Sequence, residues 1–276
     1  MSGILYVVGT PIGNLGDISP RALETLEKCD FIAAEDTRVS LKLLNHFGIK
    51  KPMISYFEHN RFERGPVIAE KILSGENGVI ITDAGMPAIS DPGEDLVKLC
   101  IEKGIKVEAV PGPCAFATAL AVSGMPSRRF TFEGFLPVEK SERKYIVNSL
   151  INEERTMIFY EAPHKLAATL SDLAAALGDR EIAIVRELTK IHEQVIKTSL
   201  CSAAEKYSAE PLKGEIVLIV TGAPRKDAEE ITFEQAVAYA NELVAKGETK
   251  TSAAKTAAKE SGFKKGDIYK ILTEEE

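Results

Sequence analysis

The chain has 276 residues, with 34 Lys and Arg against 41 Asp and Glu, so its formal net charge is −7. A hydrophobic share of 45% and a charged share of 27% are ordinary for globular proteins, which excludes a disordered, collagen-like or coiled-coil chain. Because single cores stop growing near about 250–300 residues, we expect two domains rather than one. A nucleic-acid substrate of such an acidic chain would need a local basic patch.

The cysteines and the N-terminal residues indicate in which cellular compartment we expect the protein. Cys-x-x-Cys pairs and Cys/His clusters are absent from the sequence, so we predict no metal site. The four cysteines are widely separated: Cys29, Cys100, Cys114 and Cys201. The first residues have no basic leader region, and no apolar stretch approaches the roughly 20 residues of a membrane span. We therefore expect a cytoplasmic protein.

The first part of the chain alternates short β-branched runs with turns and helical patterns. The expected strands are 4–8, 31–34, 79–82 and 107–110, and the expected helices are 19–28, 67–74, 94–103 and 114–123. Strand–turn–helix alternation is typical of an α/β domain with a mostly parallel sheet. We assign this first α/β domain to residues 1–122.

A turn-rich stretch, Ser123-Gly124-Met125-Pro126, indicates a domain joint. After it we expect strands at 156–160, 181–185, 194–198 and 215–221, with helices at 140–152 and 164–177. These elements predict a second, mixed α/β domain at residues 123–228.

Residues 229–276 predict a small helical domain. The apolar spacing and the turn residues give helices at 231–246, 252–260 and 267–273, which is similar to a helix-turn-helix. Residues 246–270 hold seven lysines against Glu248, Glu260 and Asp267, a net of +4. This segment is either a solvated helical tail or a contact for RNA.

Three turns directly follow predicted strands, at 9–17, 82–93 and 110–117. The first misses both the dinucleotide fingerprint and the phosphate-binding loop, and Pro11 removes a backbone donor. In a parallel sheet all three turns would face one crevice. Their residues offer acceptors and little positive charge, which favours a cationic or neutral small ligand over a phosphate. The alternative is three ordinary turns.

Six motifs follow one another along the chain: Gly9-Thr10-Pro11-Ile12-Gly13-Asn14-Leu15-Gly16-Asp17-Ile18, Ala34-Glu35-Asp36-Thr37-Arg38, Thr82-Asp83-Ala84-Gly85-Met86-Pro87, Ile89-Ser90-Asp91-Pro92-Gly93, Pro111-Gly112-Pro113 and Gly134-Phe135-Leu136-Pro137. Together they resemble the tetrapyrrole-methylase superfamily, and in particular its branch that methylates small-subunit ribosomal RNA. The order and spacing of the motifs agree with that branch over residues 4–225, although Phe57 stands where the family segment is expected to have a histidine.

The resemblance implies an S-adenosylmethionine-dependent enzyme that methylates the ribose 2′-hydroxyl of a cytidine in the decoding region of the small-subunit rRNA. It also implies two α/β domains with the cofactor in the cleft between them, and a homodimer. The cofactor-binding residues that it implies are Pro11, Asp83, Ala84, Gly85, Met86, Ile89, Cys114, Ala115, Tyr160, Leu188, Gly214, Glu215 and Ile216.

A ribose hydroxyl is a weak nucleophile, so methyl transfer to it calls for a base or a strong orienting acceptor. Candidates in the cleft-facing turns are Glu35, Asp36 and Asp83, and His59 and Lys190 are less favoured candidates. We favour Asp36, with Arg38 either pairing with it or holding an RNA phosphate. The alternative is that Asp36 only caps the helix that follows it.

RNA binding requires cations, and five of them surround the Gly134-Phe135-Leu136-Pro137 motif: Arg128, Arg129, Lys140, Arg143 and Lys144. Phe130, Phe132 and Phe135 are interleaved with them, so phosphate contact plus base stacking is one interpretation. Burial of at least two of these rings in a strand core is the other.

Two other functions remain open at this point. One is methylation of a tetrapyrrole or another small acceptor by a member of the same superfamily. The other is a non-catalytic RNA-binding factor of ribosome assembly that retains the cofactor pocket.

Overall fold

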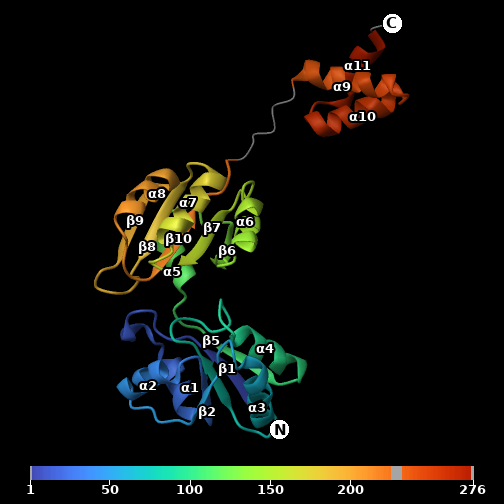
Figure 1. Ribbon diagram of the computed structural model, residues 1–276. Helices are drawn as coiled ribbons and strands as arrows, with labels where there is room; N and C mark the ends of the chain where they lie inside the picture. The colour runs from blue at the N-terminus through green and yellow to red at the C-terminus, as the bar shows by residue number, and fades with distance from the viewer. Residues whose placement is uncertain (1, 225–231, 275–276) are drawn as a thin grey trace. The chain divides into compact units, whose positions relative to one another are not determined.

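The computed structural model describes residues 2–224 and 232–274 (Figure 1). Its internal contacts divide the chain into two compact units, Met1–Ala223 and Pro224–Glu276. The first unit contains two five-stranded sheets, and the second unit is helical. Within the described residues, none of the helices combines the length and the hydropathy of a membrane span.

The first sheet is parallel throughout and has the strand order β3-β2-β4-β1-β5. This confirms the parallel α/β architecture that the alternating pattern predicts. Its strands are β1 Ile4–Val8, β2 Phe31–Ala34, β3 Met53–Ser55, β4 Gly78–Ile81 and β5 Lys106–Val110. The sequence did not predict β3, because three half-buried residues carry almost no periodic signal.

Helices cover both faces of this sheet, since β4 is buried on both sides. On one face Val79 and Ile81 pack against α1 Pro20–Lys28 and α2 Thr37–His46, and on the other Ile80 packs against α3 Arg61–Leu73 and α4 Gly93–Glu102. A short 3₁₀ turn, η1 Leu15–Asp17, precedes α1. α3 begins six residues before the predicted start because the helix continues through Pro66.

The second sheet has the order β6-β7-β10-β8-β9. Only the β6–β7 pair is parallel, which confirms a mixed sheet. Its strands are β6 Phe130–Phe135, β7 Thr156–Glu161, β8 Glu181–Arg186, β9 Gln194–Ser199 and β10 Ile216–Val220. One face carries α6 Lys140–Ser149, α7 Leu166–Leu177 and α8 Leu200–Ala209.

The other face of the second sheet is covered by α5 Ala115–Ser123. This helix follows β5 in the chain, yet its Ala119 and Leu120 pack against β7, β8 and β10. The predicted domain boundary between residues 122 and 123 therefore stays a prediction. The predicted boundary between residues 228 and 229 lies outside the described residues.

The C-terminal unit consists of α9 Phe233–Ala245, α10 Lys250–Ser261 and α11 Lys265–Glu274 around its own core. Small residues let the helices approach closely: Ala236 and Ala240 face Ala253, Ala254 and Ala257. Thr232 forms a capping box with Gln235, and Thr249 caps α10. The three predicted helices are confirmed.

Candidate functional site

A cavity of about 480 Å³ lies where the turns after the first sheet's strands meet residues of the second sheet. That volume is typical of a small-molecule pocket. We call it the central cavity, and it is lined by Ile12, Glu35, Thr82, Asp83, Ala84, Gly85, Met86, Ile89, Ser90, Asp91, Cys114, Ala115, Phe135, Tyr160, Glu161, Ala162, Pro163, Leu188, Glu215, Ile216 and Val217.

Glycines allow the turns to pack against one another below this cavity. Thr10 and Gly85 exchange backbone hydrogen bonds of 2.9 and 3.1 Å. A Cβ atom on Gly9 would lie 2.6 Å from the Cα of Gly112 and 2.7 Å from the sulfur of Met86. Only a residue without a side chain permits this approach. The three turns therefore meet at one cavity, as the parallel topology predicts.

The turn after β4 is held by Asp91. Its carboxylate accepts backbone N–H groups from Ala88 at 3.0 Å, Ile89 at 3.1 Å and Gly93 at 2.8 Å. Ala88 and Ser90 both have left-handed backbones, with φ of 65° and 63°. Such strain is uncommon for residues other than glycine and concentrates at functional sites, where the surrounding structure enforces it.

The central cavity is acidic. Glu35 is half-buried, and its pKa is raised first by burial and then by the charges of Asp83 and Asp91. Burial also raises the pKa of Asp83. Among the described residues that line the cavity there is no Lys, Arg or His. A positive ligand is favoured here over a phosphate.

Asp36 faces a different environment. It caps α2, where its carboxylate accepts the backbone N–H of Arg38 at 2.8 Å and pairs with the Arg38 guanidinium at 2.7 Å. The hydrogen bonds from Arg38 lower the pKa of Asp36 to about 2. Asp36 thus caps α2, as one of the two interpretations expects, and its role in catalysis stays a prediction. Neither Asp36 nor Arg38 lines the central cavity, although the Asp36 N–H donates to Asp83 Oδ1 at 3.1 Å.

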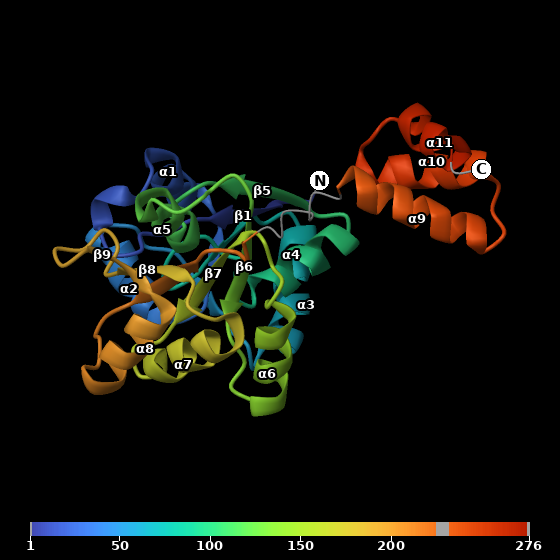
Figure 2. The same ribbon diagram turned by 90° about the horizontal axis from the view of Figure 1, so that it is seen from above.

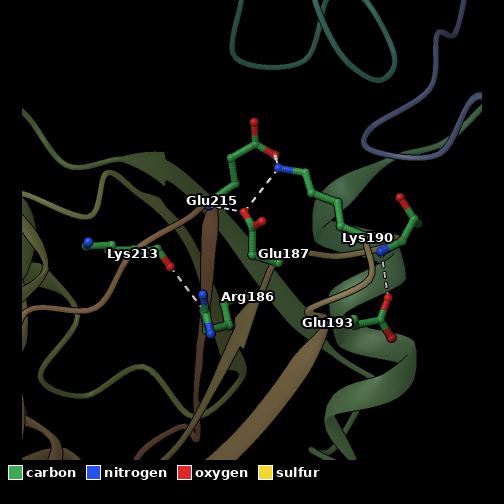
Figure 3. A network of polar contacts seen from close by, with 7 residues as sticks. Arg186, Glu187, Lys190, Glu193, Lys213 and Glu215 are labelled. Atoms are coloured by element: carbon green, nitrogen blue, oxygen red, sulfur yellow. Dashed lines mark hydrogen bonds and ion pairs between the residues drawn. The ribbon is translucent and has the colours of Figure 1, made fainter.

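The connection after β8 supports the second wall of the cavity (Figure 3). Lys190 Nζ lies 3.0 Å from Glu187 Oε1 and 3.1 Å from Glu215 Oε2. The Glu215 N–H also donates to Glu187 Oε1 at 3.0 Å, and this bond is the largest cause of the lowered pKa of Glu187. A Cβ on Gly214 would lie 2.5 Å from that same oxygen. This network fixes Glu215 at the cavity rim.

Eleven of the thirteen predicted cofactor-binding residues line the central cavity: Asp83, Ala84, Gly85, Met86, Ile89, Cys114, Ala115, Tyr160, Leu188, Glu215 and Ile216. Pro11 and Gly214 do not, but each directly precedes a lining residue. The Tyr160 hydroxyl accepts the Phe116 N–H at 3.2 Å, and burial raises the pKa of Tyr160 to about 12.

The family resemblance also implies that the turn after β7, residues 160–164, supplies the opposite wall of the cofactor site. Glu161, Ala162 and Pro163 line the central cavity, and the Glu161 side chain is buried. Its carboxylate accepts hydrogen bonds from the Ala162 N–H and from the Thr169 hydroxyl. The sequence therefore located this segment, although only Tyr160 of it stood among the thirteen predicted cofactor-binding residues.

The five predicted RNA-binding cations do not form one cluster. Arg128 and Arg129 are exposed just before β6, whereas Lys140, Arg143 and Lys144 lie on α6 beyond its other end. A strand of this length separates the two groups by about 17 Å. Arg143 is only 14% exposed, and its Nε lies 2.6 Å from Asp172.

The burial of the three aromatic rings differs from what the strand-core interpretation predicts. Phe132 packs in the core between α5 and the second sheet, but Phe130 and Phe135 are 40% and 58% exposed. The expectation that at least two of them are buried is therefore wrong. Phe130 and Phe135 are the first and last residues of β6, whereas Phe132 lies between them and stacks on Phe116 of α5.

Comparisons with known proteins agree on one family. The family model for tetrapyrrole (corrin/porphyrin) methylases matches residues 4–204. A relative from Synechocystis sp., named ribosomal RNA small subunit methyltransferase I, is 45% identical over 99% of this chain and 98% of its own length. A relative of the same name from Haemophilus influenzae is 46% identical over 98% of this chain and 96% of its own length.

A solved structure extends the comparison to the fold. Uroporphyrin-III C-methyltransferase from Thermus thermophilus, crystallised with S-adenosylhomocysteine, aligns with a TM-score of 0.57 at 16% identity. The alignment covers 79% of this chain and 97% of that chain. At this identity the likeness concerns the fold alone.

Proposed function

Because the chain belongs to the tetrapyrrole (corrin/porphyrin) methylase family, we propose that it is an S-adenosylmethionine-dependent methyltransferase of small-subunit ribosomal RNA. Two relatives that bear this name match it over nearly their whole length, which supports the assignment to rRNA. The single observation that carries the proposal in the structure is the central cavity, whose described lining combines five carboxylates with no Lys, Arg or His; the five are Glu35, Asp83, Asp91, Glu161 and Glu215.

The residues of the central cavity fit S-adenosylmethionine. Its sulfonium is a cation without a phosphate, so Glu35, Asp83 and Asp91 favour it electrostatically. The backbone of Ala84 and Gly85, with Met86 and Ile89, would hold the methionine portion. Cys114, Ala115, Tyr160, Leu188, Glu215 and Ile216 would hold the adenosine, with Pro11 and Gly214 shaping the two walls. When bound, the cofactor supplies an activated methyl group.

The acceptor that we propose is the ribose 2′-hydroxyl of a cytidine in the decoding region. We propose Glu35 as the base, because it lines the central cavity and its raised pKa makes its carboxylate a better proton acceptor than an ordinary glutamate. It would accept the hydroxyl proton while the cavity walls orient the oxygen toward the methyl donor. This choice differs from the sequence-based preference for Asp36.

Asp36 and Arg38 remain candidates with a more limited role. A carboxylate with a pKa of about 2, paired with a guanidinium, is a weak base. We propose that the pair fixes the start of α2, so that the Asp36 N–H holds the Asp83 carboxylate at the cavity rim. If the Asp36→Asn variant keeps its turnover and its cofactor binding, Asp36 is not the base.

The RNA contacts and the assembly are also proposals. Arg128, Arg129, Lys140 and Lys144 are exposed and available to phosphates, and the lysines of the C-terminal unit would add a second contact. Arg143 is the weakest member of this set, because Asp172 and Thr169 already engage its guanidinium. We further propose a cytoplasmic homodimer, which light scattering of the purified protein would test.

Incubation with methyl-labelled S-adenosylmethionine tests the function. Small ribosomal subunits, free rRNA and a tetrapyrrole mixture are offered as separate acceptors. Label in subunit rRNA supports the proposal. Label in the tetrapyrrole supports a small-acceptor methyltransferase, and binding to subunits without any label supports a non-catalytic assembly factor.

A further inference from the structure

A second cavity lies between α6 and α7, which are side by side on the outer face of the second sheet (Figure 2). Its volume is about 670 Å³. We call it the α6–α7 groove. Pro137 and Val138 form one end, Lys140 and Lys144 form the α6 side, and Lys165 lies where α7 begins.

The groove is basic. Its lining holds four cations and one carboxylate, that of Asp172. Arg143 neutralises Asp172, and its Nη2 donates to the Thr169 hydroxyl at 2.8 Å. Within residues 2–224 and 232–274, the side chains of the other three cations form no ion pair or hydrogen bond; these are Lys140, Lys144 and Lys165. Three free ammonium groups around one hollow favour a polyanion.

Two chain segments continue from the groove into the central cavity. After β6, Phe135 lines the central cavity, and Pro137 and Val138 line the groove. After β7, residues 161–163 line the central cavity, and Lys165 lines the groove. The two hollows are therefore neighbours joined by these two segments, which we call the shared wall. A strand lying in the groove would be led directly to the reacting centre.

We propose that the α6–α7 groove binds the phosphate backbone of the RNA strand whose target ribose enters the central cavity. Lys140, Lys144 and Lys165 contact the phosphates. Phe135, which is 58% exposed at the junction of the two hollows, offers a ring on which a neighbouring base stacks. The inference rests on the proposed function and adds the path of the substrate.

In this arrangement Arg143 is a positioning residue rather than a phosphate ligand. Its guanidinium holds the Thr169 hydroxyl, which in turn bonds the buried Glu161 at the end of β7. That chain of contacts keeps the shared wall in place. Lys165 follows residues 161–163 of this wall in the chain and lines the groove. It is therefore the third cation available to RNA, in place of Arg143.

The test compares two triple variants in binding to free small-subunit rRNA and to whole subunits. The first is Lys140→Ala, Lys144→Ala and Lys165→Ala. The control is Lys50→Ala, Lys98→Ala and Lys206→Ala, which removes the same charge from exposed positions outside the groove. Affinity is measured by filter binding over a salt series, and S-adenosylhomocysteine binding is measured by calorimetry for each protein.

We expect the groove variant to bind rRNA at least tenfold more weakly, with a salt slope smaller by about 2, and to bind S-adenosylhomocysteine as the wild type does. The control variant should keep most of the affinity. Equal losses in both variants, or no loss in the groove variant, would overturn the proposal. So would a loss of binding to whole subunits alone, because it would indicate a ribosomal protein as the partner.

Methyl transfer by the wild type is recorded in parallel. Transfer to rRNA combined with unchanged binding by the groove variant would reject the groove and leave the function standing. Absence of any transfer to rRNA would reject the function itself.

Discussion

Glu35 and Asp36 are adjacent carboxylates with opposite pKa shifts. Glu35 is half-buried and faces two other acids, so its pKa is raised, whereas Arg38 lowers the pKa of Asp36 to about 2. When the environment shifts the pKa values of two neighbouring carboxylates in opposite directions, the two groups can take different roles. Here Glu35 would act as the base and Asp36 would have a structural role. The sequence shows that both residues follow β2, but not which of them turns into the cavity.

Replacement of each acid by its amide should separate the two roles. Glu35→Gln is expected to lower turnover by about 10²- to 10⁴-fold and to preserve S-adenosylhomocysteine binding. Asp36→Asn is expected to stay within a few-fold of wild type, because Asn is also a good helix cap. Single-turnover methylation rates, with calorimetry as the control for binding, provide the comparison. Equal rates for Glu35→Gln and wild type would exclude the base.

The raised pKa of Glu35 also predicts a pH dependence of stability. Between the pKa of an unfolded glutamate and the higher folded value, the folded state binds more protons, so the free energy of unfolding falls as pH rises. Glu35→Gln should therefore unfold at an equal or higher temperature than wild type at pH 7. The difference should shrink as pH falls through the folded pKa. Thermal melts at several pH values measure it, and a less stable variant at pH 7 would contradict it.

At the scale of elements, the turns after β1 and β5 depend on contact between two glycine backbones. Gly9→Ala should force these turns apart, because the new Cβ would lie 2.6 Å from Gly112. We expect at least a tenfold loss of S-adenosylhomocysteine affinity. Gly48→Ala is the matched control, since Gly48 has a φ of +71° and nothing within 4 Å of a Cβ. It should lower the melting temperature and leave binding intact.

Some of the strands could be predicted from sequence patterns alone, and others could not. Strands β1 and β2 and the turns that follow them were predicted at their observed bounds, because buried β-branched runs ending in Gly or Asp are strong local signals. For β6 the sequence left a strand core and an RNA-binding segment open, because its aromatic residues lie among charged residues that fit either interpretation. The place of Arg143 was not predictable either, since its partner Asp172 lies on another helix.

At the scale of the whole molecule, the central cavity lies entirely within the first unit, and the C-terminal unit has a core of its own. Local signals predicted the three C-terminal helices. The approach of Lys165 to the lysines of α6 was not predicted, because only the packing of α7 against α6 brings them together. The net charge of −7 is therefore compatible with RNA binding, since the positive charge is concentrated locally.

Removal of residues 225–276 should leave cofactor binding unchanged and weaken RNA binding, because this segment carries the lysines of 246–270. Calorimetry with S-adenosylhomocysteine and a salt series of rRNA binding measure the two effects. An unchanged salt slope would show that the C-terminal lysines belong to a solvated helical surface. Loss of cofactor binding would show that the first unit is not independent.

The most direct measurement is nucleoside analysis of methyl-labelled rRNA. Small subunits are incubated with the protein and labelled S-adenosylmethionine, and their RNA is digested to nucleosides and separated by chromatography with mass detection. We predict label in 2′-O-methylcytidine, accumulating at least about a hundredfold more slowly when Glu35→Gln replaces the wild type under the same conditions. Label on a base, or in an added tetrapyrrole but not in RNA, would contradict the assignment.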